Sequence, residues 1–554
     1  MSNLGLIWRT IRHLRLIQII YRVIFRLYKP RIYFGEAVKL RDSTSDWHIP
    51  ICGRPVLTGP GQFLIFGHRH DVKNEGWNPS HLPKLLCYNL HYFNELKVQD
   101  VNARLKWHQE LIAQWILENP PPLGNGWEPY PTSLRIVNWV KWAQLHPKLV
   151  SVEMVNSLAI QARYLEKRLE WHLLGNHLFA NAKALMFAGL FFQGEEANRW
   201  VNTGVRIISR QLIEQILPDG GQFELSPMYH ALALEDILDI ISLTKRYSSG
   251  LTAIQAEIVH EWSRYISPML TWLNAMTHPD DEISFFNDAA FGVAAKNSAL
   301  RDYASRLVQK FSEPISTPCH SLPDSGYYRL QRGQAIIIAD LASVGPNYLP
   351  AHAHADTLSF ELSLATQRVI VNGGTGTYET GLERSLQRGT TAHSTLCLDG
   401  ENSTEVWAGF RVGRRASVFD VEILEQTNET IIEASHDGYT HLFGSPLHRR
   451  RWTLTDKGLK LDDFILGKGT HNVEIFFHLH PDIEISLINE QSARMSSKNG
   501  DLSVDMTVSE NAKLNLIRSE WHPEFGLKIP TQTICLTNLA TLDAQISTTL
   551  IWQV

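Results

Sequence analysis

The stretch from Ala351 to Leu364, AHAHADTLSFELSL, lies in the region where the pattern of apolar residues changes. Its second half alternates polar and apolar residues, a pattern typical of a half-buried β-strand. Upstream, apolar residues recur mostly at spacings of three and four, which indicates helices; downstream, short β-branched runs dominate. The chain therefore predicts helices first and strands afterwards, with the change near Glu313 to Pro323.

The helical part is divided by Pro- and Gly-bearing breaks. Seven helices in succession suggest stacked antiparallel pairs, as in a bundle, a solenoid or a toroid. The predicted helices are Ala103 to Asn119, Ser133 to Leu145, Ser151 to Glu170, Asn176 to Phe192, Glu195 to Leu217, Glu235 to Tyr247 and Thr252 to Ala275.

The second part predicts many short strands with no helix between them, which favours a large antiparallel sandwich. The predicted strands are Gln334 to Ala339, Ser359 to Leu364, Arg368 to Val371, Ser394 to Leu398, Ser417 to Leu424, Thr430 to Glu433, Val473 to His478, Lys513 to Ile517 and Ser547 to Trp552. The fold class is therefore multidomain α+β.

Composition fits a globular protein of two or three domains, since the chain has 554 residues, 44% of them hydrophobic and 20% charged. A net charge of −5 argues against nucleic acid as the main partner, because phosphate binding needs a basic surface. The five cysteines are scattered with no CxxC motif, so we expect free thiols rather than a disulfide framework or a zinc knuckle.

The N-terminus has a different charge from the rest of the chain. Residues 1–34 carry seven Lys/Arg and no acid before Glu36, and their apolar spacing predicts a basic amphipathic helix. Its uncharged runs are too short to span a bilayer, and their order is not that of a signal peptide. The helix either docks on an anionic membrane or a partner complex, or packs on the protein itself. We expect a protein that is cytoplasmic or peripheral at the inner membrane.

Two polar clusters open predicted helices. Gly175, Asn176 and His177 follow a helix break, where free N–H groups suit a carboxylate ligand, although Asn is also a common N-cap. The second cluster, QFELSPMYH, ends in Tyr229 and His230; a tyrosine acts as general base or acid when its pKa is tuned, or it is simply packed by its ring.

The third cluster is the HAHAD run at residues 352–356. In an extended chain His352, His354 and Asp356 share one face, a set that suits a metal or a substrate, or else a solvated polar face. His393 precedes another predicted strand downstream. Asn287 and Asp288, which follow two phenylalanines, are candidates to contact a His or an Arg in the cleft, with helix capping or interdomain packing as the alternative.

Taken in order, GNH, QFExSPxYH, HxHADxxSF and RxTxAHxT resemble the heparinase II/III-like family and related alginate lyases. The matching motifs lie within about residues 80–410. The resemblance implies an N-terminal (α/α) toroid followed by a C-terminal antiparallel β-sandwich, with the substrate cleft between them. The expected segments are 1–35 for the basic helix, 36–315 for the toroid and 316–554 for the sandwich.

The resemblance also implies residue roles. Asn176, His177, Tyr229 and His352 match the catalytic positions, with Asn176 and His177 on the uronate carboxylate. A structural divalent metal, zinc or similar, would be held by His354, Asn372 and His393, where Asn372 replaces the family's aspartate. Residues expected to contact the sugar are Arg135, His230, Glu224 and Arg388.

The implied reaction is β-elimination on an acidic polysaccharide. Removal of the C5 proton of a uronate builds charge on its carboxylate, which Asn176 and His177 would stabilise. Tyr229 or His352 would take that proton, Tyr229 could protonate the leaving O4, and no organic cofactor is needed. Two other hypotheses are a non-catalytic or biosynthetic partner protein in exopolysaccharide assembly, motivated by the N-terminal segment, and a metal-dependent hydrolase built on the histidine pair.

Overall fold

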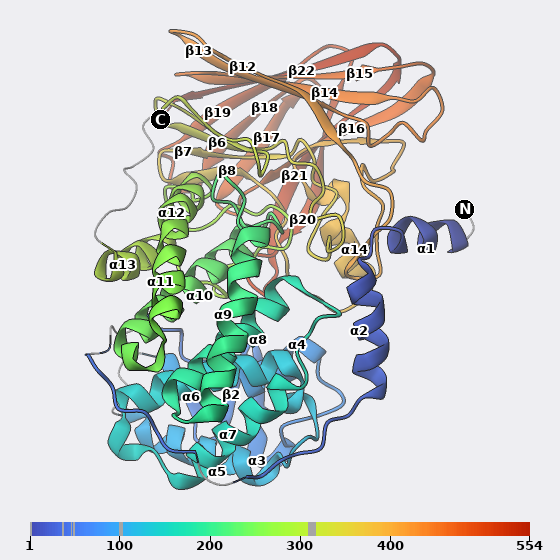
Figure 1. Ribbon diagram of the computed structural model, residues 1–554. Helices are drawn as coiled ribbons and strands as arrows, with labels where there is room; N and C mark the ends of the chain where they lie inside the picture. Colours follow the sequence, from blue (N-terminus) through green and yellow to red (C-terminus); the bar gives the residue numbers. More distant parts are fainter. Residues whose placement is uncertain are drawn as a thin grey trace.

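The computed structural model describes residues 3–35, 38–45, 47, 50–98, 103–308 and 317–553. Helices fill one half of the molecule and two stacked sheets fill the other, as Figure 1 shows. The predicted α+β class is therefore confirmed. Of the two predicted domain boundaries, the one between 315 and 316 falls at residues outside those that the structure describes, and both boundaries stay predictions.

The helical half is built around α8 (Gly175–Phe191), which is apolar on all sides and buried along most of its length. A helix that is hydrophobic all round requires neighbours on every side, and α8 packs on α6, α7, α9 and α10. The helices are α3 (Val72–Glu75), α4 (Lys84–Tyr92), α5 (Leu105–Glu118), α6 (Pro129–Leu145), α7 (Val152–Glu166), α9 (Glu195–Gln215), α10 (Pro227–Arg246), α11 (Ala253–Trp262), α12 (Ile266–Ala275) and α13 (Asn297–Leu307).

Two details of the helical half differ from the sequence expectation. The predicted helix Thr252 to Ala275 is two helices, α11 and α12, separated by a 3-10 turn at Ser263–Tyr265. The single basic N-terminal helix is also two, α1 (Asn3–Ile11) and α2 (Leu16–Leu27). A small antiparallel sheet, β1 (Leu57–Gly59), β2 (Gln62–Ile65) and β3 (His68–Asp71), precedes α3.

The other half is an antiparallel sandwich. One sheet has the order β12-β13-β14-β15-β22-β19-β18-β17, and the other the order β20-β21-β16-β8-β7-β6-β5-β4, with β9 also pairing β16. The first sheet comprises β12 (Val418–Glu425), β13 (Glu429–His436), β14 (Leu447–Thr455), β15 (Gly458–Leu466), β17 (Ile483–Asn489), β18 (Ser492–Ser497), β19 (Ser503–Val508) and β22 (Ala544–Gln553).

The second sheet comprises β4 (Cys319–Leu322), β5 (Tyr327–Arg332), β6 (Ala335–Asp340), β7 (Phe360–Leu364), β8 (Gln367–Val371), β9 (Leu396–Leu398), β16 (Thr470–Leu479), β20 (Lys513–Trp521) and β21 (Ile529–Thr541). Both sheets contribute to one apolar core, with Trp452 from the first and Phe477 from the second fully buried. Alternating burial along strands such as β14 is what a sandwich requires of its inner faces. In chain order, α14 (Leu382–Arg388) lies between β8 and β9. The short hairpin of β10 (Val406–Trp407) and β11 (Arg411–Val412) lies between β9 and β12.

A separate apolar cluster joins the two halves. Leu225 and Trp272 from the helical half pack with Tyr327 and Ile338 from the sandwich. The Tyr327 hydroxyl donates to the carbonyl of Leu225 at 2.7 Å, just before α10 begins. The interface therefore fixes the start of α10, where Tyr229 lies.

No helix in the part of the chain that the structure describes combines the length and the apolar character needed to cross a membrane.

Candidate active site

Tyr229 and His352 lie against each other at the interface of the two halves. Their ring centroids are 4.0 Å apart, and the Tyr229 hydroxyl is 3.1 Å from the hydroxyl of Tyr378. Burial raises the pKa of Tyr229 well above its usual value, and the neighbouring Tyr378 and Tyr130 add to the shift. Tyr229 therefore holds its proton at neutral pH, which suits a general acid.

The start of α10 explains the position of Tyr229. Leu225 takes a left-handed φ of 59°, Ser226 caps the helix by accepting from the Tyr229 N–H at 3.2 Å, and Pro227 fills the first helical position. Asn287 Nδ2 donates to the Leu225 carbonyl at 2.8 Å. The cap, the proline and the two bonds to Leu225 together set where Tyr229 points.

Asp288 organises the histidines. Its fully buried carboxylate accepts from His352 Nδ1 at 2.9 Å and from His354 Nε2 at 2.8 Å, and it forms a two-pronged ion pair with Arg384. Burial alone would raise the pKa of Asp288, but Arg384 and the two histidines outweigh it and hold that pKa well below its usual range. Because an ionised carboxylate only accepts, both histidines donate to it, which assigns their tautomers.

That assignment gives His352 its chemistry. With Nδ1–H bound to Asp288, the Nε2 atom carries the lone pair and can accept a proton. Nε2 lies 3.5 Å from a Glu224 oxygen, and the His352 side chain is 10% exposed, so it is near the surface but firmly anchored. Asp288 thus orients His352 as a base.

Asn176 and His177 lie at the start of α8, close to the same site. Gly175 has φ of 52°, and a Cβ there would come within 2.3 Å of Leu349, so the turn requires glycine. The Asn176 N–H lies 3.4 Å from the Glu224 oxygen Oε1, while the other Glu224 oxygen faces His352. Glu224 therefore lies between the start of α8 and His352.

His177 is supported by Glu170, which precedes it on the loop into α8. The His177 Nδ1 lies 3.2 Å from Glu170, and its ring lies 4.6 Å from that of Tyr130. Burial works against the charged imidazole, but Glu170 and Glu224 raise the pKa of His177 above its ordinary value overall. The side chain is 33% exposed, so it can present a positive charge to a ligand.

A second group next to this network has the chemistry of a metal site. Ligand atoms of His354, Asp356 and His393 all lie within 4.8 Å of one another. His354 Nδ1, which carries the lone pair, lies 3.2 Å from His393 Nε2. Two nitrogens bound to one tetrahedral zinc at usual lengths are separated by about 3.3 Å, so the pair fits. Burial lowers the pKa of His354 to about 4 and of His393 to about 3, which keeps both in the neutral form that binds metals.

Asn372, the third ligand expected from the family resemblance, has other partners. Its side-chain oxygen accepts from the Ser394 N–H at 3.0 Å, and its Nδ2 donates to the Phe285 carbonyl at 2.9 Å. Asp356 lies among the two histidines instead. In this arrangement the hydrogen bonds of Asn372 hold the chain just after β8. The carboxylate grouped with the two histidines is that of Asp356, in the HAHAD run.

The residues expected to contact the sugar lie mostly inside the protein. Arg135 is fully buried over the Trp115 ring, and its polar contacts are to Gln161, His91 and Thr132, with no carboxylate among those described. His230 is fully buried. Its Nε2 is hydrogen-bonded to the Met269 carbonyl, and its Nδ1 accepts a hydrogen bond from the Gln222 N–H.

Arg388, 1% exposed, donates to the Ala353 carbonyl at 2.8 Å. Arg135, His230 and Arg388 are buried and contact other protein groups, and direct sugar contacts by these three residues stay predictions. Glu224, 2% exposed, lies next to two of the expected catalytic positions, Asn176 and His352.

Sequence reasoning missed several supporting residues. Arg384, Tyr378 and Glu170 were not singled out: the partners of the first two lie far away in the sequence, and Glu170 stands outside the GNH motif, 7 residues before His177. Arg384 and Asp288 are 96 residues apart, and Tyr229 and Tyr378 are 149 apart, so no local spacing could show them. The Asn-Asp pair at 287–288 was a candidate, and the structure places Asp288 on both a His and an Arg.

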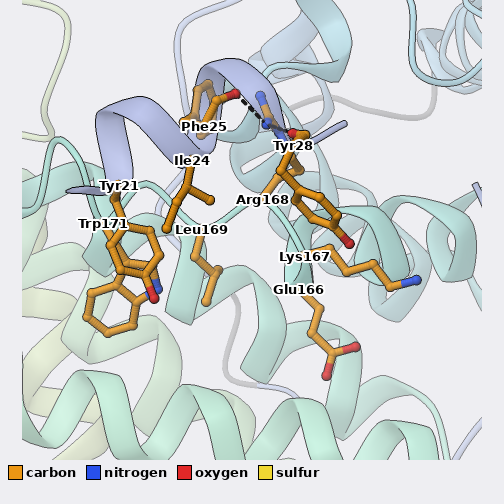
Figure 2. Close-up of a pocket in the computed structure, with 9 residues that line it drawn as sticks. All are labelled: Tyr21, Ile24, Phe25, Tyr28, Glu166, Lys167, Arg168, Leu169 and Trp171. Carbon is orange, nitrogen blue, oxygen red and sulfur yellow. Dashed lines mark hydrogen bonds between the residues drawn. The ribbon is translucent and has the colours of Figure 1, made fainter. Parts of the chain in front are cut away.

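A pocket of about 200 Å³ lies beside this site rather than in it. Tyr21, Ile24, Phe25 and Tyr28 of α2 line one side, and residues 166–169 and 171 line the other, as Figure 2 shows. Arg168 donates to the Phe25 and Tyr28 carbonyls. The loop that carries Glu170 therefore has α2 packed against its outer side.

Comparisons with known proteins agree with this architecture. The family model for the heparinase II/III N-terminus matches residues 107–314, and the model for the heparinase II/III-like C-terminal domain matches residues 314–549. The chain belongs to the heparinase II/III-like family.

Two relatives and one solved structure illustrate the similarity. The heparin-sulfate lyase of Pedobacter heparinus is 24% identical over 415 residues, which are 68% of this chain and 59% of that protein. The FtsZ-localized protein C of Caulobacter vibrioides is 23% identical over 417 residues, 68% of each chain. The crystal structure of heparinase III superposes with a TM-score of 0.70 at 18% identity, covering 87% of this chain and 80% of that one, which shows a shared fold. The chain spans 36% to 59% of the length of the three heparin-sulfate lyases it matches.

Proposed function

We propose that the protein is a polysaccharide lyase that cleaves a uronate-containing polysaccharide by β-elimination. The observation that carries the proposal is the contact of Tyr229 with His352, 4.0 Å between ring centroids, beside the helix start that presents Asn176 and His177. An acid, a base and a carboxylate-binding pair are the groups that this reaction needs. Membership of a family that includes heparin-sulfate lyases supports it.

In the proposed mechanism His177 and Asn176 bind the uronate carboxylate and stabilise the charge that develops on it. Nε2 of His352 accepts the C5 proton, since Asp288 occupies Nδ1. The electron pair of the broken C5–H bond forms the C4–C5 double bond, and the C4–O4 bond breaks. Tyr229, which keeps its proton because burial raises its pKa, donates that proton to the leaving O4.

A divalent metal, zinc or similar, would be held by His354, Asp356 and His393 and would supply structural rigidity. In this proposal the metal would only hold the loop that carries His352, which stands two residues before His354. The chemical steps use only side chains of the chain itself.

The test is to incubate the purified protein with acidic polysaccharides and to follow the ultraviolet absorbance of a 4,5-unsaturated uronate. Absorbance that rises with time and enzyme, and disappears in Tyr229→Phe, is the expected result. New reducing ends without this absorbance, across all uronate polymers, would rule out elimination and point to hydrolysis.

The alternative is a non-catalytic or biosynthetic partner protein in exopolysaccharide assembly. Two observations favour it: the exposed basic N-terminal helices, and the similarity to a protein named for its localisation with FtsZ. A stable complex with a membrane glycosyltransferase and no turnover of any uronate polymer would support this alternative over the lyase.

A further inference from the structure

Helices α1 and α2 each carry an apolar stripe that faces solvent. In α1 the exposed apolar residues recur at i, i+3, i+4 and i+7, and α2 repeats that spacing from its first residue. At 100° per residue this spacing places them on one face of each helix. Exposed fractions are 78% for Leu4, 42% for Ile7, 62% for Trp8, 42% for Ile11, 71% for Leu16, 50% for Ile19, 46% for Ile20, 55% for Val23 and 79% for Leu27.

The opposite faces of both helices are fixed to the protein body. Arg9 forms a two-pronged pair with Glu405, and the Trp407 Nε1–H donates to Thr10 Oγ1 at 3.1 Å, which ties α1 to the sandwich half. Gln18 of α2 is 2% exposed and donates to the Tyr348 carbonyl at 3.3 Å.

Phe25 of α2 lies 4.1 Å from His172, ring to ring, against the helical half. Figure 1 shows the two helices along one side of the molecule. The apolar stripes therefore cannot turn inward without breaking these contacts.

The charge on this surface is one-sided. Residues 1–35 include seven Lys/Arg and no acid, whereas the rest of the chain carries 45 basic and 57 acidic residues. Arg9 and Arg15 pair with Glu405 and Glu214. Across the described part of the chain no carboxylate pairs with the other five basic residues, which are all exposed: Arg12, Arg22, Arg26, Lys29 and Arg31. On the helical wheel Arg22 and Arg26 lie at one edge of the α2 stripe.

We propose that α1 and α2 form a docking surface for an anionic membrane, lying in the plane of the interface without crossing it. An apolar stripe bordered by basic residues matches the acyl boundary and the charged headgroups of such a surface. Trp8, Tyr28, Tyr33 and Phe34 are exposed on the same segment, and aromatic rings favour the headgroup level. A second copy of this chain fits less well, because two such basic surfaces would repel each other.

The docking surface is independent of the proposed lyase activity. Because α1 is tied to the sandwich and α2 to the helical half, docking would hold both halves in one orientation to the membrane. It would also place the loop with Glu170, against which α2 packs, next to the lipid surface.

The experiment is vesicle co-flotation of the full chain. Vesicles of phosphatidylcholine alone are compared with vesicles of phosphatidylcholine and phosphatidylglycerol. We expect at least about tenfold more protein on the anionic vesicles, with the difference reduced by salt. The double variant Leu16→Glu with Leu27→Glu should abolish flotation. Its matched control, Leu117→Glu with Leu539→Glu, adds the same charge at positions that are 81% and 74% exposed and should float like wild type.

Charge is tested by Arg22→Gln with Arg26→Gln, which should lower flotation on anionic vesicles by about tenfold or more. Sedimentation of each protein without vesicles reports on self-association. The proposal is overturned if wild type does not float with anionic vesicles, or if the Leu16/Leu27 and control variants behave alike. A dimer that the Leu16/Leu27 variant dissociates, with no vesicle binding by wild type, would identify a second copy as the occupant instead.

Discussion

His352 donates from Nδ1 to the buried carboxylate of Asp288 at 2.9 Å. The same carboxylate accepts from Nε2 of His354 at 2.8 Å, so one ionised group fixes the tautomers of two histidines with different tasks. The lone pair of His352 is left on Nε2 for proton transfer, and that of His354 on Nδ1, facing His393. Asp288 therefore connects the proposed eliminating site to the candidate metal site through its hydrogen bonds to His352 and His354.

Tyr229→Phe should reduce the turnover of a uronate polymer at least about 10²-fold, because the proton for the leaving oxygen is removed. The ring and its contact with His352 remain, and the loss of one hydroxyl pair costs about 1 kcal/mol in the free energy of unfolding. Tyr378→Phe removes the other partner of that pair and serves as the control, with a smaller loss expected. Steady-state kinetics with ultraviolet detection separates the two, and equal rates in wild type and Tyr229→Phe would contradict the acid role.

His352→Ala should reduce kcat by about 10²- to 10⁴-fold, since no base remains at the C5 proton. The fold should persist, because Asp288 keeps Arg384 and His354 as partners. His320→Ala, a half-buried histidine on β4, is the matched control and should leave kcat unchanged. Thermal unfolding measured alongside distinguishes a lost base from a lost fold.

The pH dependence of substrate binding should follow His177. Its folded-state pKa lies above 6.5 because Glu170 outweighs burial, so the cationic form binds uronate at low pH and KM rises as pH passes that folded pKa. By linkage, the stability that His177 contributes is complete below its unfolded pKa and lost as pH rises through the folded value.

Glu170→Gln removes the main cause that raises this pKa, so the rise in KM should move to lower pH. Glu166→Gln, at the end of α7 and paired with Arg199, should not move it. If the dependence of KM on pH is the same in wild type and in both variants, His177 does not bind the substrate carboxylate.

Arg384 should be a large contributor to stability. Its ion pair with Asp288 is fully buried, and breaking a buried pair from one side typically costs about 3–5 kcal/mol. Arg384→Met should therefore lower the free energy of unfolding by an amount in this range, measured by urea denaturation. Arg494→Met breaks an ion pair whose side chains are 57% and 48% exposed, and should change the free energy of unfolding far less, because solvent screens an exposed pair. Similar losses in the two variants would mean that Asp288 does not depend on Arg384.

How far the sequence predicts this site depends on where each partner lies in the chain. Asn176, His177, Tyr229 and His352 stand in short motifs at element starts, so local pattern and family resemblance could identify them. Arg135, in a polar-aromatic stretch, was expected to pair with a sugar carboxylate, yet tertiary packing buries it over Trp115. The two-helix N-terminus was also not foreseen, because a continuous apolar spacing does not show the break at residues 12–15. Which face of α2 lies against the protein is decided by contacts such as Gln18 with Tyr348, far away in sequence.

The metal ligands can be decided by comparing Asp356 with Asn372. Asp356→Asn and His393→Ala should each remove most of the divalent ion from the purified protein, measured by elemental analysis, because they are two of the three grouped ligands. Asn372→Ala should keep the ion but lower stability by about 1–3 kcal/mol, since the Ser394 N–H and the Phe285 carbonyl lose a buried partner. If Asn372→Ala instead releases the ion while Asp356→Asn retains it, the ligand set is His354, Asn372 and His393, as the family resemblance implied. In that case Asp356 serves only to accept the Asn287 N–H.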